Sequence, residues 1–523
     1  MSLNLEVLND WVRNYIKSLA CKAHHKVEPI HIFLTGSVGC GKSYLITTIS
    51  DMLKKALSYR AGNLEKNKIL ILAPTGVAAI NVEGNTIHSA LGIPVDRSFT
   101  KNISKLSDKK RCMLRNRLSE LSIIVIDEIS TVSNKLFLHI HQQLTEIFGC
   151  SDDIPFAGIS VIACGDFYQL PPIQARPIYA DYKDVLLNLL HCWKYFKIAE
   201  LTEVMRQRGD QCSIELLNNI RVGKLETRHE DVLKSKFILQ NDPNYPKDVI
   251  HIFAENQPAS EHNKNMLNSI ALDEINIEAI DKIPENNPVS MVQKLYSRSQ
   301  METGGLAQNL LLKLNALVML TTNIDISEKL ITGQIGTIHR IKTDGLGKVT
   351  KIYLKMKDKS TGVKAMRTDP YAMQENVISL SRIEKKIKFN KHNLAALTIK
   401  RMQFPLMSWT CTVHKVHGKT FKKIVVCFDL IRQRAFHSGQ IYVALSRVTS
   451  LEGLYLTGTF SRSAIKSDTR ATKQYNYMRA HSKLTLKDTG VISGNSIIVT
   501  LLNTRSYNKH KNDIKSDRVL MEK

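Results

Sequence analysis

The sequence predicts an α/β protein whose core is a parallel β-sheet. Short apolar runs at residues 30–34, 68–73, 121–126 and 161–164 alternate with stretches of helical periodicity. Strands that alternate with helices favour a doubly wound parallel sheet, in which ligand loops follow the carboxyl ends of the strands. At 523 residues, with 43% hydrophobic content, the chain is long enough for about three or four globular domains.

A glycine-rich loop at residues 36–43 follows the first apolar run and precedes a helical stretch. Its pattern, G-x-x-x-x-G-K-S in a strand–loop–helix context, predicts a phosphate-binding loop. Backbone N–H groups would face the phosphates, Lys42 would reach the β- and γ-phosphates, and the Ser43 hydroxyl would ligate Mg²⁺. The alternative is a flexible turn before an amphipathic helix. The residues expected to hold the nucleotide are Gly36, Ser37, Val38, Gly39, Cys40, Gly41, Lys42 and Ser43.

Two adjacent carboxylates, Asp127 and Glu128, end the apolar run at 121–126. A nucleotide hydrolase needs one carboxylate to hold Mg²⁺ and another to orient or deprotonate the attacking water. We therefore assign the metal to Asp127 and the water to Glu128. An acidic pair after a strand can also be purely structural, but the phosphate loop requires a metal-holding partner.

The charge of the chain predicts a polyanionic partner. Its 73 Lys and Arg exceed its 48 Asp and Glu, which gives a net charge of +25. Nucleic acid is the first candidate for such a partner. The excess is concentrated in residues 97–120 and 339–401, whereas a generally basic surface would spread it evenly. For the segment 97–120, a solvated helix face and a contact to backbone phosphates both stay open.

The cysteines and the hydropathy predict an intracellular, soluble protein. The nine cysteines are scattered and never spaced as C-x-x-C, which argues for a reducing compartment and against a zinc site or a disulfide framework. The chain has no apolar run of the length that a membrane span needs, and its first residues lack the pattern of a signal peptide.

Seven motifs, in order, carry a resemblance to a known family. They are APTGVAAINVEGNTIHSALG (73–92), IDEIS (126–130), GDFYQLPP (165–172), LTEVMRQ (201–207), ALVMLTTN with LITGQIGT (316–323 and 330–337), WTCTVHKVHGKT (409–420) and QIYVALSRV (440–448). Together with the phosphate loop, these motifs resemble the RecD-like, petite-integration-frequency (PIF) helicases of superfamily one, over about residues 30–456. A P-loop kinase or GTPase would carry neither GDFYQLPP nor the arginine of YVALSRV.

The resemblance implies two RecA-like P-loop domains that close around ATP and Mg²⁺. It implies a first domain at 30–205, with the basic insertion 97–120, and a second at 206–456, with a small β-barrel-like insertion at about 338–402. An amphipathic helix is expected within residues 1–29 and a basic, flexible tail at 457–523. The residues with expected catalytic roles are Lys42, Asp127, Glu128, Gln169 as γ-phosphate sensor, and Arg206 and Arg447 as cations from the second domain.

The resemblance also implies a DNA helicase that moves 5′ to 3′ on single-stranded DNA and opens forked duplexes, acting as a monomer in the nucleus or the mitochondrion. Repair, recombination, telomere maintenance and transposition are all compatible pathways. The strand-contacting positions of the family correspond here to Thr75, Val77, Thr86, His88, Asn323, His414 and Lys415.

The sequence departs from the family pattern at several positions. The adenine-contacting glutamine has no equivalent in residues 1–26, His417 stands where the family carries glutamine, and Thr332 stands where asparagine is usual. Residues 501–520 resemble the start of an endonuclease/exonuclease/phosphatase domain, as fused to such helicases in Helitron-type transposons. A catalytically impaired, transposon-derived nucleic-acid-binding relic is therefore the alternative to an active helicase.

Overall fold

The computed structural model describes residues 29–58, 68–94, 106–182, 190–207, 209–246, 249–282, 306–325, 328–330, 334–391, 394–408, 410–428 and 436–482. The expected N-terminal helix, the first part of the basic insertion and the tail beyond residue 482 lie outside the described residues. Among the described residues, no helix is both long and apolar enough to span a membrane.

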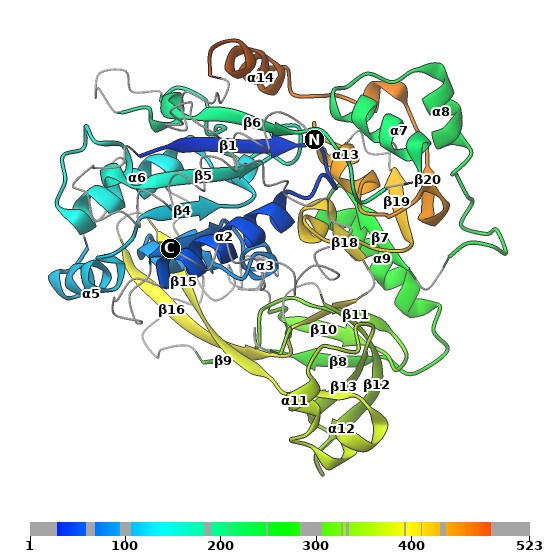
Figure 1. The fold of residues 1–523 in the computed structure, drawn as a ribbon. Helices are drawn as coiled ribbons and strands as arrows, with labels where there is room; N and C mark the ends of the chain where they lie inside the picture. The colour runs from blue at the N-terminus through cyan, green and yellow to red at the C-terminus, as the bar shows by residue number, and fades with distance from the viewer. Residues whose placement is uncertain are drawn as a thin grey trace, which may run out of the picture.

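A six-stranded parallel sheet forms the first domain, in the order β3-β2-β4-β5-β1-β6. Neighbouring residues of β1 point to opposite faces, so that Phe33 joins one hydrophobic cluster while Ile32 and Leu34 join another. Helices cover both faces (Figure 1). The strands are β1 (His31–Gly36), β2 (Ile69–Ala73), β3 (Asn85–Thr86), β4 (Ile123–Ile126), β5 (Ser160–Gly165) and β6 (Lys197–Leu201). The helices are α2 (Lys42–Ser58), α3 (Gly76–Asn81), α4 (Ile87–Leu91), α5 (Asp108–Leu118) and α6 (Asn134–Phe148).

A second parallel sheet, in the order β18-β7-β19-β20, forms the centre of the second domain. Its strands are β7 (Ile250–Phe253), β18 (Thr410–Thr412), β19 (Ile424–Phe428) and β20 (Leu454–Gly458), with helices α7 (Gln211–Arg221), α8 (Thr227–Lys234), α9 (Asn256–Asn268) and α13 (Gln440–Leu445). Two parallel sheets of this kind confirm the predicted α/β class, with RecA-like domains.

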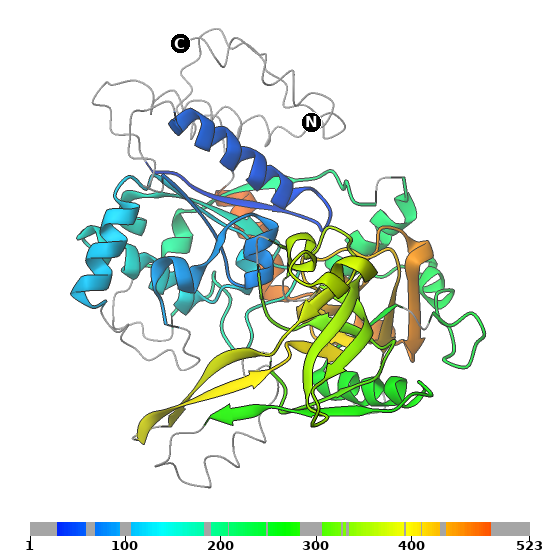
Figure 2. The same cartoon turned by 90° about the horizontal axis from the view of Figure 1, so that it is seen from below.

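Antiparallel strands form a separate region below the two parallel sheets (Figures 1 and 2). A five-stranded sheet has the order β14-β13-β12-β11-β17, and smaller sheets pair β15-β16-β9 and β10-β8. The β15–β16 hairpin projects beyond the rest of this region (Figure 2). The strands are β8 (Ile275–Glu278), β9 (Ile280–Lys282), β10 (Asn309–Leu312), β11 (Leu317–Leu320), β12 (Ile335–Thr343), β13 (Val349–Met356), β14 (Ile378–Leu380), β15 (Ile383–Lys391), β16 (Leu394–Gln403) and β17 (Leu406–Ser408), and the helices are α11 (Val363–Met366) and α12 (Pro370–Glu375).

The expectation of a flexible segment from residue 457 is wrong for residues 457–482. Thr457 and Gly458 end β20, and α14 (Thr469–His481) follows. Ala471, Tyr475 and Met478, spaced for one helix face, are buried in the core of the first domain. This stripe of three residues is narrow and lies among charged residues, which is why the composition of the segment concealed it. The chain thus returns from the second domain to the first (Figure 1).

Helix α5 uses part of the basic charge of segment 97–120 inside the fold. The side chains of Arg115 and Arg117 each donate to a backbone carbonyl at 2.6 Å, and Lys110 Nζ donates to another at 2.9 Å. The acceptors belong to α6 and to the end of α4. These three cations therefore anchor the helix to its own domain, a role that differs from both alternatives considered for the segment.

Candidate active site

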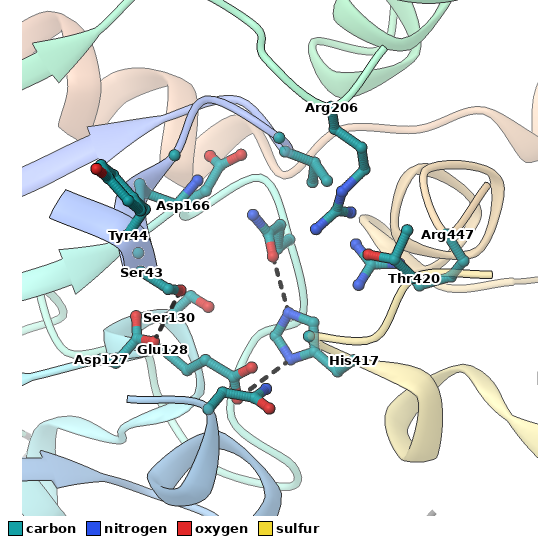
Figure 3. Close-up of a pocket in the computed structure, with 18 of the residues that line it drawn as sticks. Ser43, Tyr44, Asp127, Glu128, Ser130, Asp166, Arg206, His417, Thr420 and Arg447 are labelled. Carbon is teal, nitrogen blue, oxygen red and sulfur yellow. Dashed lines mark hydrogen bonds and ion pairs between the residues drawn. The ribbon is translucent and has the colours of Figure 1, made fainter. Parts of the chain in front are cut away.

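A cavity of about 630 Å³ lies between the two parallel-sheet domains. It is lined from the first domain by Val38, Gly39, residues 41–44 and the loops after β4 and β5. The linker after β6, the loop after β18 and the segment after α13 close it from the other side (Figure 3). All six residues with expected catalytic roles line this cavity: Lys42, Asp127, Glu128, Gln169, Arg206 and Arg447.

The phosphate loop, residues 36–43, connects β1 to the N-terminus of α2. Gly39 and Gly41 have φ of +82° and +84°, in the left-handed region that glycine adopts without strain. A Cβ at Gly39 would also lie 2.6 Å from Arg206 Cβ, so the loop touches the linker closely. Lys42 Nζ donates to the carbonyl oxygens of Gly36, at 2.8 Å, and Ser37, at 2.9 Å.

The eight predicted loop residues divide into two groups. Val38, Gly39, Gly41, Lys42 and Ser43 line the cavity. Gly36, Ser37 and Cys40 instead support the loop: the first two supply carbonyls to Lys42, and Cys40 is buried behind it. Backbone N–H groups at the start of a helix favour an anionic ligand, so the arrangement suits a phosphate chain.

Ser43 and Asp127 meet at the point where a metal ion would be needed. Ser43 Oγ donates to Asp127 Oδ2 at 3.2 Å, and Asp127 Oδ1 accepts from the backbone N–H of Glu128 at 2.9 Å. Burial raises the pKa of Asp127, against the opposing effects of the Glu128 hydrogen bond and the Lys42 charge. A hydroxyl and a carboxylate oxygen are the ligand types that Mg²⁺ prefers, so the residues present fit this ion.

Glu128, His417 and Gln169 form a chain of contacts across the cavity (Figure 3). His417 Nε2 lies 2.8 Å from Gln169 Oε1, and His417 Nδ1 lies 3.5 Å from Glu128 Oε2. Burial and then the Asp127 charge raise the pKa of Glu128 to about 8, while burial and the Arg447 charge lower the pKa of His417 to about 3. The contact between His417 and Glu128 therefore has the length of an ion pair, but the imidazole carries no charge at pH 7, because it is buried beside an arginine.

Arg206 and Arg447 face the cavity from the side opposite Ser43 and Asp127 (Figure 3). Arg206 Nη1 donates to the carbonyl of Ser446 at 3.2 Å. Arg447 is 2% exposed and donates to Val443 O at 2.7 Å, Ser446 Oγ at 2.8 Å and Lys419 O at 3.2 Å. Burial and the Arg206 charge lower its pKa to about 9, which leaves it protonated at neutral pH. The cavity therefore has cations along both of its walls.

Sequence reasoning missed two supports of the site. Tyr442 places its hydroxyl 2.7 Å from the backbone N of Val38, which joins α13 to the phosphate loop. Asp166 accepts from Arg221 at 2.9 Å and from Tyr475 at 3.1 Å. Both Tyr442 and Asp166 lie within motifs already noted, but only the contacts between distant segments reveal their roles.

Among the predicted DNA-contacting residues, none whose side chain is described lines the cavity. Thr86 caps α4 by accepting from the N–H of Ser89, and Thr75 Oγ1 accepts from the N–H of Ala78. Burial lowers the pKa of His88. The side chains of Val77 and Lys415 lie outside the described ones. Contact of these seven residues with DNA, Asn323 included, stays a prediction.

The chain is similar to known PIF1-like helicases. Residues 9–231 match the family model of PIF1-like helicases. The chain is 27% identical over 537 residues to the ATP-dependent DNA helicase PIF1 of Candida albicans, covering 87% of this chain and 55% of that protein. Against the human protein of the same name the identity is 29% over 467 residues, with 87% and 62% covered. The chain thus spans less than two thirds of the length of these relatives.

Solved structures show the same fold. The crystal structure of Pif1 helicase from Candida albicans aligns with a TM-score of 0.65 at 24% identity, over 90% of this chain and 98% of that one. That of Pif1 helicase from Bacteroides in complex with ADP-AlF3 and ssDNA aligns with a TM-score of 0.62 at 23% identity, over 90% and 97%. At these sequence identities, the structural similarity supports a shared fold and nothing further.

Proposed function

We propose that this chain is a PIF1-like helicase, an ATP-dependent DNA helicase that moves along single-stranded DNA and unwinds forked duplexes. One observation carries the proposal: the phosphate loop, two carboxylates and Gln169 face two arginines of the other domain across a single cavity. The net charge of +25 supports a nucleic acid as the second ligand.

In this proposal ATP binds with its phosphates over residues 38–43. The Lys42 ammonium group breaks its hydrogen bonds to the carbonyls of Gly36 and Ser37 and forms new ones to phosphate oxygens. These charge-assisted hydrogen bonds compensate the loss of the first two. Ser43 and Asp127 are the residues that would hold Mg²⁺, and the ion would supply positive charge against the phosphates. In its ionised form, which its pKa of about 8 makes the minor form at pH 7, Glu128 orients the attacking water and accepts its proton.

Arg206 and Arg447 stabilise the charge that develops on the transferred phosphoryl group. The backbone N–H of Arg206 donates to Gly39 O of the phosphate loop at 3.1 Å, whereas Arg447 belongs to the second domain. Arg447 therefore acts on the γ-phosphate only when the domains are close. ATP binding therefore favours the closed arrangement of the domains, and ATP hydrolysis allows the domains to open again. The strand would move because the two arrangements bind DNA with different strength. The contacts to the strand would come from Thr75, Val77, Thr86 and His88 of one domain and from Asn323, His414 and Lys415 of the other.

The proposal places the protein on nuclear or mitochondrial DNA, as a monomer with 5′ to 3′ polarity. Strand displacement tests it directly, with one duplex that carries a 5′ single-stranded tail and one that carries a 3′ tail, each with and without ATP and Mg²⁺. We expect ATP-dependent unwinding of the 5′-tailed duplex alone. Unwinding of neither would favour the nucleic-acid-binding relic, and unwinding of only the 3′-tailed duplex would overturn the polarity.

A further inference from the structure

His417 lies between the two domains. It follows the short 3₁₀ helix Val413–Val416 of the second domain, yet both of its ring nitrogens face groups of the first domain. Only 8% of the residue is exposed. The dashed lines at His417 in Figure 3 mark these two contacts, one of which runs to Glu128.

The chemistry of imidazole suits this position. A neutral ring has one donor and one acceptor nitrogen, and they diverge from a rigid plane. When Nε2–H donates to Gln169 Oε1, Nδ1 can accept a hydrogen bond from the protonated carboxyl group of Glu128. When the Gln169 amide is turned to donate, the other tautomer donates Nδ1–H to the ionised carboxylate. In both arrangements one ring fixes the carboxyl group relative to the amide.

The backbone beside His417 brings this loop unusually close to Glu128. Gly418 has φ of +78°, and a Cβ there would lie 3.1 Å from Glu128 Oε1. The next residue, Lys419, offers its carbonyl to Arg447 Nη1 at 3.2 Å. Residues 417–419 therefore contact the candidate base and one candidate arginine at the same time. A displacement of this short segment cannot leave both of those groups where they are.

The same segment is continuous with a predicted DNA contact. His414 lies on the 3₁₀ helix that leads into His417, and its side chain is exposed. We propose that His417 is a positioning residue that transmits DNA binding to ATP hydrolysis, by setting Glu128 and Gln169 in place when a strand is held by residues 414–415. This inference rests on the proposed function, and it concerns the regulation of the same site.

Steady-state ATP hydrolysis with and without single-stranded DNA tests the inference. His417→Phe keeps an aromatic ring and removes both nitrogens, whereas His417→Gln keeps a donor and an acceptor. For the phenylalanine variant we expect the DNA-stimulated kcat to fall roughly 10-fold, as for the loss of one or two hydrogen bonds in the transition state. Its basal kcat without DNA should fall less than the DNA-stimulated kcat, so that the ratio of the two rates drops, and its KM for ATP should stay within about 2-fold of wild type. The glutamine variant should keep most of the stimulation.

The matched control is His229→Gln, a buried histidine on α8 that does not line the cavity. It should change neither rate. Full DNA stimulation in His417→Phe, or equal losses with and without DNA, would overturn the inference, as would an equal loss in the control. Failure of the parent proposal has a different signature, since the wild-type chain would then hydrolyse no ATP in response to DNA.

Discussion

Arg221 and Asp166 form a two-pronged ion pair that joins the two domains beside the cavity. Arg221 Nε and Nη2 each donate to one carboxylate oxygen of Asp166 at 2.9 Å. Arg221 ends α7, which packs in the second domain, and Asp166 follows β5 of the first. Burial by itself would raise the pKa of Asp166, but the charge and hydrogen bonds of Arg221 hold it below its usual range.

Asp166→Asn should lower the free energy of unfolding by about 3 kcal/mol at pH 7, since it leaves the arginine of a buried pair without its counter-charge. The sign of the pH dependence follows from the lowered pKa. Asp166 stabilises the fold above the pKa of an unfolded aspartate, about 3.9, and this stabilisation is lost as the pH falls through the native pKa. Denaturant unfolding from pH 7 to pH 3 should therefore show the difference in free energy of unfolding between variant and wild type becoming smaller.

Glu226→Gln, in an exposed pair with Arg228, is the control, with no measurable change in stability. A difference between Asp166→Asn and wild type that stays constant with pH would contradict this account.

Lys42→Ala should reduce ATP hydrolysis by at least about 100-fold, because the variant lacks the cation that meets the β- and γ-phosphates. Affinity for single-stranded DNA should stay within about 2-fold of wild type, since Lys42 lines only the nucleotide cavity. Phosphate release and fluorescence anisotropy measure the two quantities. Lys224→Ala, an exposed lysine outside the cavity, serves as the control. Survival of DNA-stimulated hydrolysis in the Lys42 variant would refute the assignment of the loop.

Arg206→Ala should lower kcat by on the order of 1,000-fold, the contribution expected of an arginine that stabilises phosphoryl transfer. Thermal stability should change little, because the Arg206 guanidinium makes a single described hydrogen bond, to Ser446. Arg447 needs the gentler change to lysine, since its guanidinium holds three acceptors of its own domain. Single-turnover hydrolysis at saturating ATP separates catalysis from binding. A variant with a raised KM and a normal kcat would assign Arg206 to nucleotide binding instead.

Tyr475→Phe should destabilise the protein by about 1–3 kcal/mol, because it leaves buried polar partners unsatisfied. The Tyr475 hydroxyl lies 2.7 Å from Thr35 Oγ1 and 3.1 Å from both Phe167 N and Asp166 Oδ1. Tyr477→Phe makes the same change two residues further along α14, where the side chain is 57% exposed, and should be neutral. Equal unfolding midpoints for the two variants would show that the buried hydrogen bonds of the Tyr475 hydroxyl do not stabilise the fold.

Much of the site could be predicted from sequence because several key residues lie shortly beyond the ends of recognisable strands. Asp127 and Gln169 lie beyond the carboxyl ends of β4 and β5, and parallel topology brings such ends to one edge of the sheet. The hydrogen bond from Val38 to Tyr442 spans 404 positions, and no local pattern encodes such a contact. Composition also could not separate a lysine that binds a carbonyl, as Lys110 does, from one that meets phosphate.

Helix α14 gives the first domain an unusual order of assembly. The strand that carries the phosphate loop and the helix that completes its core are joined by a hydrogen bond between residues 440 positions apart, Thr35 and Tyr475. A chain emerging from the ribosome therefore makes the whole second domain before the first can bury Phe33 and Trp193 against their last neighbours. Such distant contacts slow folding and leave apolar surface open to chaperones during synthesis.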